Sequence, residues 1–148
     1  MLHIATHGLL NADRPELSGI LLSLFDRDGL PQAGFFSAAD AARLELSADL
    51  VVLSGCRTAL GREVDGEGIV GLARGFLYAG TARVMASLWK VDDAATAALM
   101  RTLYRGLLGS RSPSPAAALR AAQLELLRQP RYQHPYYWAG FQLYGEAR

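Results

Sequence analysis

The chain has 148 residues, of which 51% are hydrophobic and 20% are charged, and its formal net charge is +1 at pH 7. These values exclude a disordered tail and fit one domain with a substantial core. The near-neutral charge, with Lys90 as the only lysine, argues against direct binding of nucleic acid. A single cysteine excludes an internal disulfide and a cysteine-rich zinc site, and no metal or cofactor is implied. No apolar run reaches membrane-span length and no signal-peptide pattern is present, so we expect a soluble, cytoplasmic protein.

Strands and helices are predicted to alternate along the chain. The first elements are a strand at 2–7, a hairpin built from 20–25 and 33–36 around a turn at 26–31, a short helix from Ser37 to about Leu44, and a strand at 49–56. The later elements are a polar loop at 57–67, a helix at 68–78, a strand at 82–89, helices at 93–108 and 116–128, and a final strand in the aromatic-rich end at 134–145. This alternation predicts an α/β fold with a mostly parallel sheet covered on both faces.

Two of the predicted strands end on reactive side chains. The first ends on His7, and the other ends on Cys56, 49 positions further along the chain. Ligands of open α/β sheets bind beyond the carboxyl ends of the strands, so neighbouring strands place these side chains together. A base beside a thiol is the minimum for a cysteine nucleophile. The alternatives are a small buried cysteine without chemistry and a buried structural histidine.

A second motif offers a rival interpretation. Gly66, Gly68 and Gly71 match a dinucleotide-binding fingerprint, with Asp92 at a suitable distance. That fingerprint follows its strand directly, whereas residues 57–65 intervene here, so we disfavour it. His3 is interpreted as a structural residue, and His134, which precedes a proline in a predicted loop, has no evident partner in the sequence.

Six separated motifs together resemble a known family, the CHAT family of caspase-like cysteine peptidases. They are Thr6–Gly8, Val51–Thr58, Gly66–Gly68, Gly71–Gly80, Ser87–Asp93 and Tyr136–Phe141. The resemblance spans almost the whole chain and preserves the order of the motifs. One departure lies at Gly55, where the family more often has alanine, an exchange that should not harm the chemistry.

The resemblance implies a caspase-like three-layer sandwich and a His–Cys dyad that cleaves a protein or peptide substrate. His7 would act as general base and Cys56 as nucleophile. The backbone N–H groups of Gly8 and Cys56 would stabilise the oxyanion. No acidic third member is evident.

The resemblance also implies a substrate site along Ala86–Val91, where an extended peptide would pair by backbone hydrogen bonds. Ser87 and Trp89 would line this cleft, and the alternative for Trp89 is an ordinary core residue. Asp92, Asp93 and Asp65 are candidates for an acidic pocket that favours a basic residue before the scissile bond. The alternative for Asp92 and Asp93 is a helix N-cap and a first-turn acid.

The domain is predicted to be 1–148, the C-terminal portion of a catalytic domain that lacks one or more N-terminal strands. Such domains normally carry further strand and helix sequence before the histidine strand, often with helical repeats upstream. We therefore expect the isolated chain to be poorly soluble or inactive, because its first strand would leave an unpaired edge. The alternative function is a catalytically inactive interaction or signalling module.

Overall fold

The computed structural model describes residues 1–11, 14, 17–55, 57–59, 67–110 and 113–146. Within these residues, four strands form a main sheet in the order β1 (Leu2–Ile4), β5 (Val51–Leu53), β7 (Arg83–Ser87) and β8 (Phe141–Gly145). The first three strands run parallel, and β8 pairs antiparallel with β7. The predicted α/β class, with a mostly parallel sheet and flanking helices, is confirmed.

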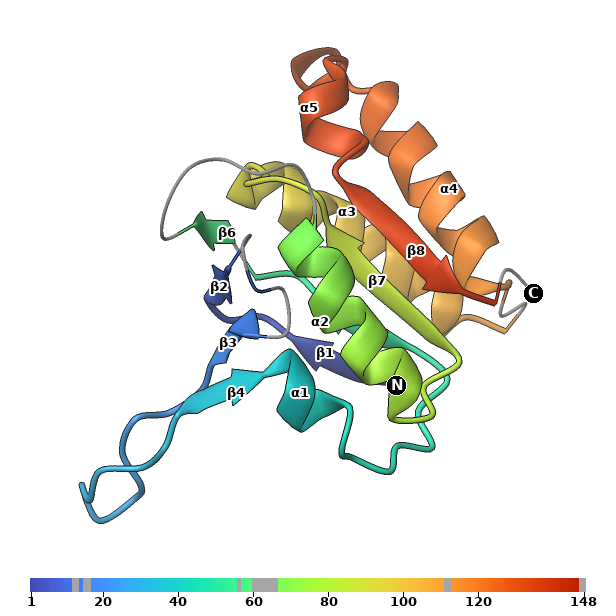
Figure 1. Cartoon of the computed structure of the whole chain (residues 1–148). Helices are drawn as coiled ribbons and strands as arrows, with labels where there is room; N and C mark the ends of the chain where they lie inside the picture. Colours follow the sequence, from blue (N-terminus) through green and yellow to red (C-terminus); the bar gives the residue numbers. More distant parts are fainter. Residues whose placement is uncertain (12–13, 15–16, 56, 60–66, 111–112, 147–148) are drawn as a thin grey trace.

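Helices cover both faces of the main sheet (Figure 1). In that view α1 (Ala38–Ala41) and α2 (Glu67–Tyr78) lie in front of the sheet, and α3 (Asp93–Leu107) lies behind it with α4 (Pro115–Leu127). A 3₁₀ turn at Pro130–Tyr132 and the short helix α5 (Pro135–Trp138) then lead into β8. The result is three layers, helix on sheet on helix.

Alternation along the strands explains why the sheet is apolar on both faces. Val52 and Met85 pack against the α3–α4 side, together with Leu99 and Leu103. The intervening strand residues, Val51, Leu53, Val84 and Ala86, point to the other side and pack against Phe76 and its neighbours on α2. Two buried clusters therefore share one sheet.

A second, smaller sheet is present, of which the sequence predicted only the hairpin. Its strand order is β4 (Phe35–Ser37), β3 (Gly19–Leu21), β2 (Gly8–Leu10) and β6 (Arg57–Ala59). The predicted first strand at 2–7 is therefore wrong in its extent: β1 ends at Ile4, and β2 begins at Gly8 in the other sheet. The predicted polar loop at 57–67 is also wrong at its start, because residues 57–59 form β6.

The predicted hairpin and helix caps are confirmed. β3 and β4 are antiparallel, and the turn between them has Gly29 at φ 79°. Beyond the paired residues the hairpin extends far from the body of the molecule, at the lower left of Figure 1. Helix α1 begins with a capping box, in which Ser37 accepts from Asp40 N–H and the Asp40 carboxylate accepts from Ser37 N–H. Hydrogen bonds from Ser37 lower the pKa of the Asp40 carboxyl.

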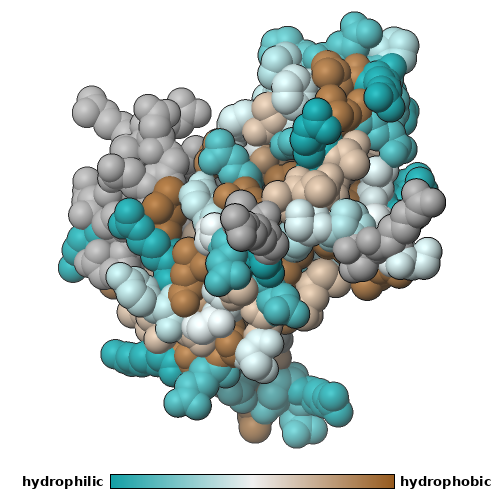
Figure 2. All heavy atoms as spheres, turned by 90° about the vertical axis from the view of Figure 1, so that its right-hand side faces the viewer, coloured by the Kyte–Doolittle hydropathy of each residue, from teal (hydrophilic) through white to brown (hydrophobic). Residues whose placement is uncertain are grey.

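The surface of the molecule is mixed in character. Figure 2 shows hydrophilic residues interspersed with hydrophobic ones on the face turned toward the viewer. Among the described residues, no helix is both long and apolar enough to cross a membrane.

Candidate functional site

The candidate site lies where both sheets meet, beyond the carboxyl ends of β1 and β5. His7 stands between β1 and β2, and its side chain is exposed. Its carbonyl accepts a hydrogen bond from Leu21 N–H at 2.8 Å, which fixes the backbone at this point. Gly8, the residue proposed for the oxyanion, opens β2 and lies opposite both Ile20 and Arg57.

Two of the predicted site residues, Cys56 and Asp65, lie outside the described residues. The residues flanking Cys56 are described. Ser54 N–H donates to the Ile4 carbonyl at 3.0 Å, and on the other side β6 begins at Arg57.

The strand pairing has the same offset on both sides of the site. Ile4 lies opposite Leu53 in the main sheet, and Gly8 lies opposite Arg57 in the smaller sheet, so each partner is 49 positions further along the chain. The pairing of β1 with β5 and the pairing of β2 with β6 therefore keep the same register, although they belong to different sheets.

Gly55 lies hard against the neighbouring segment. A Cβ added to Gly55 would collide with the Thr6 backbone carbonyl. The alanine more usual in the family could enter here only if one of the two backbones moved. The exchange noted in the sequence thus has a structural counterpart, a close approach of the two segments beside His7.

Ser87 and Trp89, two of the residues predicted to bind substrate, lie in different environments. Ser87 ends β7 with 2% of its surface exposed, and its hydroxyl lies 3.5 Å from the Gly55 carbonyl oxygen, at the outer limit of a hydrogen bond. Trp89 packs partly buried against the α3–α4 cluster, and its indole N–H donates to the Tyr136 carbonyl at 3.0 Å. Both side chains are thus engaged within the protein.

Asp92 and Asp93 stand at the start of α3. The Asp92 carboxylate accepts from Ala95 N–H at 2.8 Å, so Asp92 is the N-cap of the helix. Asp93 lies in the first turn, with its side chain exposed. The capping role weighed in the sequence is therefore confirmed for Asp92, and the exposed carboxylate of Asp93 is the one with open access to solvent.

Two histidines have partners that the sequence did not indicate. His134 is the N-cap of α5, where its Nδ1 accepts from Tyr136 N–H at 3.2 Å. His3 on β1 contacts the Ser54 hydroxyl and the Tyr104 hydroxyl. Through Ser54, the His3 imidazole contacts the segment that precedes Cys56 in the sequence. Within the described part of the chain, no group of three or more His, Cys, Asp or Glu side chains is arranged to hold a metal ion.

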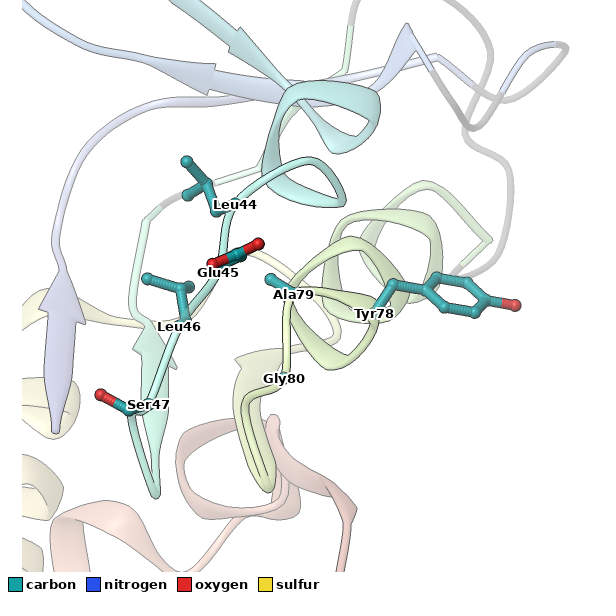
Figure 3. Close-up of a pocket in the computed structure, with 7 residues that line it drawn as sticks. All are labelled: Leu44, Glu45, Leu46, Ser47, Tyr78, Ala79 and Gly80. Carbon is teal, nitrogen blue, oxygen red and sulfur yellow. The ribbon is translucent and has the colours of Figure 1, made fainter.

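A separate surface pocket lies at the opposite end of the sheet (Figure 3). It is lined by residues that precede β5 and β7, namely Leu44, Glu45, Leu46, Ser47, Tyr78, Ala79 and Gly80. The Tyr78 side chain points away from the others in Figure 3, and 82% of it is exposed. This pocket is remote from His7, because it adjoins the amino ends of the strands.

Comparison with known proteins identifies the family. The model of the CHAT domain matches residues 1–146. The chain is 40% identical over 109 residues to Tetratricopeptide repeat protein 28 of Mus musculus and 37% identical over 109 residues to that of Homo sapiens. Each match covers 74% of this chain and 4% of the length of the relative. The chain belongs to the CHAT domain family, which is caspase-like.

Proposed function

We propose that this domain is a cysteine endopeptidase that cleaves a protein partner, with His7 as general base and Cys56 as nucleophile. The observation that carries the proposal is the common pairing offset, 49 positions in both ladders around the site. His7 and Cys56 are separated by the same 49 positions in the sequence. The exposure of His7 adds support, because a general base must reach the substrate.

The chemistry follows from these two groups. His7 takes the thiol proton, and the Cys56 sulfur forms a bond to the scissile carbonyl carbon. Backbone N–H groups at Gly8 and Cys56 receive the charge that develops on oxygen. The His7 imidazolium then protonates the amine as the carbon–nitrogen bond breaks. Water, deprotonated by His7, attacks the acyl-enzyme, and the carbon–sulfur bond breaks to release the acid and the thiolate.

A thiol-alkylation experiment tests whether His7 activates Cys56. Because Cys56 is the only cysteine of the chain, iodoacetamide modification followed by peptide mass spectrometry reports on one site. An unperturbed thiol, with a pKa near 8.5, is only a few per cent ionised at pH 7. We expect His7→Ala to slow alkylation at pH 7 at least about fivefold. Equal rates in the wild type and His7→Ala would contradict the dyad.

The matched control for this test is His134→Ala. His134 is also exposed, but it caps the short helix α5 and has its hydrogen bond to Tyr136 N–H there. Its removal should leave the alkylation rate unchanged. A slow rate in both variants would point to a general effect on the fold.

The acidic residues at the start of α3 support a preference for Arg or Lys before the scissile bond. We expect Asp93→Asn to lower kcat/KM for a substrate with Arg at that position by roughly fivefold, as a single solvent-accessible charge pair allows. A substrate with Leu before the scissile bond should be cleaved equally well by the wild type and by Asp93→Asn. Asp92→Asn tests the neighbouring charge with little loss of the cap, because asparagine also caps helices.

The control for charge is Asp49→Asn. Asp49 is exposed, but it precedes β5 at the opposite end of the sheet. Substrate profiles that favour Asp or a large apolar residue before the scissile bond would refute the predicted preference.

The name of the relatives supports tetratricopeptide repeats as a further partner of this domain in the full-length protein.

A further inference from the structure

The imidazole of His3 joins three elements of the fold. Its Nε2 lies 2.6 Å from the Ser54 hydroxyl, which follows β5, and its Nδ1 lies 2.8 Å from the Tyr104 hydroxyl on α3. The His3 and Tyr104 rings are also in contact, with centroids 5.5 Å apart. Both nitrogens of the ring are therefore used.

Partial burial favours the neutral forms of His3 and Tyr104. Partial burial lowers the pKa of His3 below its ordinary value, and partial burial raises the pKa of Tyr104. A neutral imidazole has one N–H donor and one acceptor nitrogen, whereas each hydroxyl can either donate or accept. Ser54, His3 and Tyr104 can thus form one continuous chain of hydrogen bonds with every ring nitrogen satisfied.

Ser54 and Gly55 are held from several directions. Ser54 N–H is bonded to the Ile4 carbonyl on β1, and the Ser54 hydroxyl is bonded to His3 on the same strand. Gly55 lies against the Thr6 backbone, and its carbonyl oxygen is 3.5 Å from the buried Ser87 hydroxyl. Among these contacts, the one made by His3 holds the Ser54 side chain rather than the backbone. A single substitution can therefore remove the His3–Ser54 hydrogen bond without breaking the strand pairing.

We propose that His3 is a positioning residue: through its hydrogen bond to Ser54, backed by Tyr104, it sets the direction of the chain after the end of β5, at Ser54 and Gly55. The inference rests on the proposed function, because the group being positioned is the nucleophile Cys56, the residue after Gly55. The net free energy of one such hydrogen bond corresponds to roughly a fivefold factor, and small misplacements of reacting groups reduce rates steeply.

The experiment compares variants that each remove one hydroxyl, in the purified protein. Ser54→Ala and Tyr104→Phe break the chain of hydrogen bonds, whereas Ser54→Thr retains a hydroxyl. Ser47→Ala and Tyr78→Phe are matched controls, because both residues lie at the surface pocket at the other end of the sheet. The readouts are the iodoacetamide alkylation rate of Cys56 between pH 6 and pH 9, kcat and KM for a peptide substrate, and the midpoint of urea unfolding.

We expect Ser54→Ala to reduce the alkylation rate and kcat roughly fivefold, with KM little changed and the unfolding midpoint lowered only as far as the loss of one hydrogen bond requires. Ser54→Thr should restore most of the rate. The double variant Ser54→Ala/Tyr104→Phe should lose less than the product of the two single effects, because both substitutions break the same chain. Such a result supports a positioning role, which a purely structural contact would not produce.

Rates in Ser54→Ala and Tyr104→Phe equal to those of the wild type and of the two controls would overturn the proposal. Comparison with His7→Ala separates this failure from failure of the proposed function. Slow alkylation in His7→Ala with unchanged rates in the Ser54 and Tyr104 variants rejects the positioning role alone. Unchanged rates in His7→Ala with slow alkylation in Ser54→Ala reject the dyad and support the role of His3.

Discussion

Cys56→Ala is expected to abolish peptide-bond hydrolysis while the domain remains folded. The thiolate is the attacking group in the proposed mechanism, so its removal deletes the covalent route. In hydrolases whose catalytic groups act as a unit, loss of the nucleophile reduces kcat by about 10⁴-fold or more. The measurement is cleavage of a peptide library by the purified protein, with circular dichroism as the test of folding.

The comparison with Cys56→Ser sharpens this prediction. Serine retains the shape of the side chain, but its hydroxyl is far less acidic than a thiol and is not ionised by a nearby histidine at neutral pH. We therefore expect the serine variant to be nearly as inactive as the alanine variant. Residual activity in Cys56→Ala close to the wild-type value would assign the hydrolysis to another group or to a contaminant. A wild type without activity or accelerated alkylation would favour the interaction module instead.

The main sheet could be predicted because its signal is local. Val51, Val52 and Leu53 form an apolar run without alternation, and all three are buried against helices on both faces. The helix boundaries were equally accessible, since Ser37, Asp92 and Gly80 carry recognisable start and stop signals. Each of these signals lies within a few residues of the element that it defines.

The strands that join the hairpin in the smaller sheet, β2 and β6, could not be predicted because their signal is not local. The run from Leu2 to His7 contains nothing that marks the end of β1 at Ile4. The chain leaves the main sheet there because Gly8 and Leu9 pair with β3, a segment further along the chain. Arg57 and Thr58 are polar residues that look like a loop, yet pairing with β2 makes them a strand. Periodicity within a single segment carries no information about such partners.

The candidate site shows the same division. His7 is predicted as a site residue because it ends an apolar run and precedes a glycine, both of which are local signals. His3 is predicted to be structural, but its two partners could not be predicted, because they lie 51 and 101 positions away in the sequence. The signal for the face on which these partners lie is the alternation of His3 with Ile4: Ile4 packs on the α2 side of the sheet, so His3 faces the α3 side, where Tyr104 lies.

The largest effect on stability is expected at Phe76. Phe76 is 1% exposed on α2, where it packs against the strand residues Val51 and Val84, and its ring centroid lies 6.3 Å from that of Phe36 on β4. Truncation of a buried phenylalanine removes apolar contact and leaves a cavity that the rigid sheet cannot fill, at a cost of about 3–5 kcal/mol. Because native domains are stable by only about 5–15 kcal/mol, Phe76→Ala should lower the urea midpoint severely.

The matched control is Tyr78→Ala on the same helix. Tyr78 is 82% exposed, so its truncation should change the free energy of unfolding by no more than about 0.5 kcal/mol. Urea titrations of both variants, followed by circular dichroism, measure the difference directly. A loss of less than about 1 kcal/mol in Phe76→Ala would contradict the prediction, because a side chain in a close-packed interior cannot be deleted at so small a cost. Such a result would mean that the side chains between α2 and the main sheet pack loosely enough to fill the space left by the Phe76 ring.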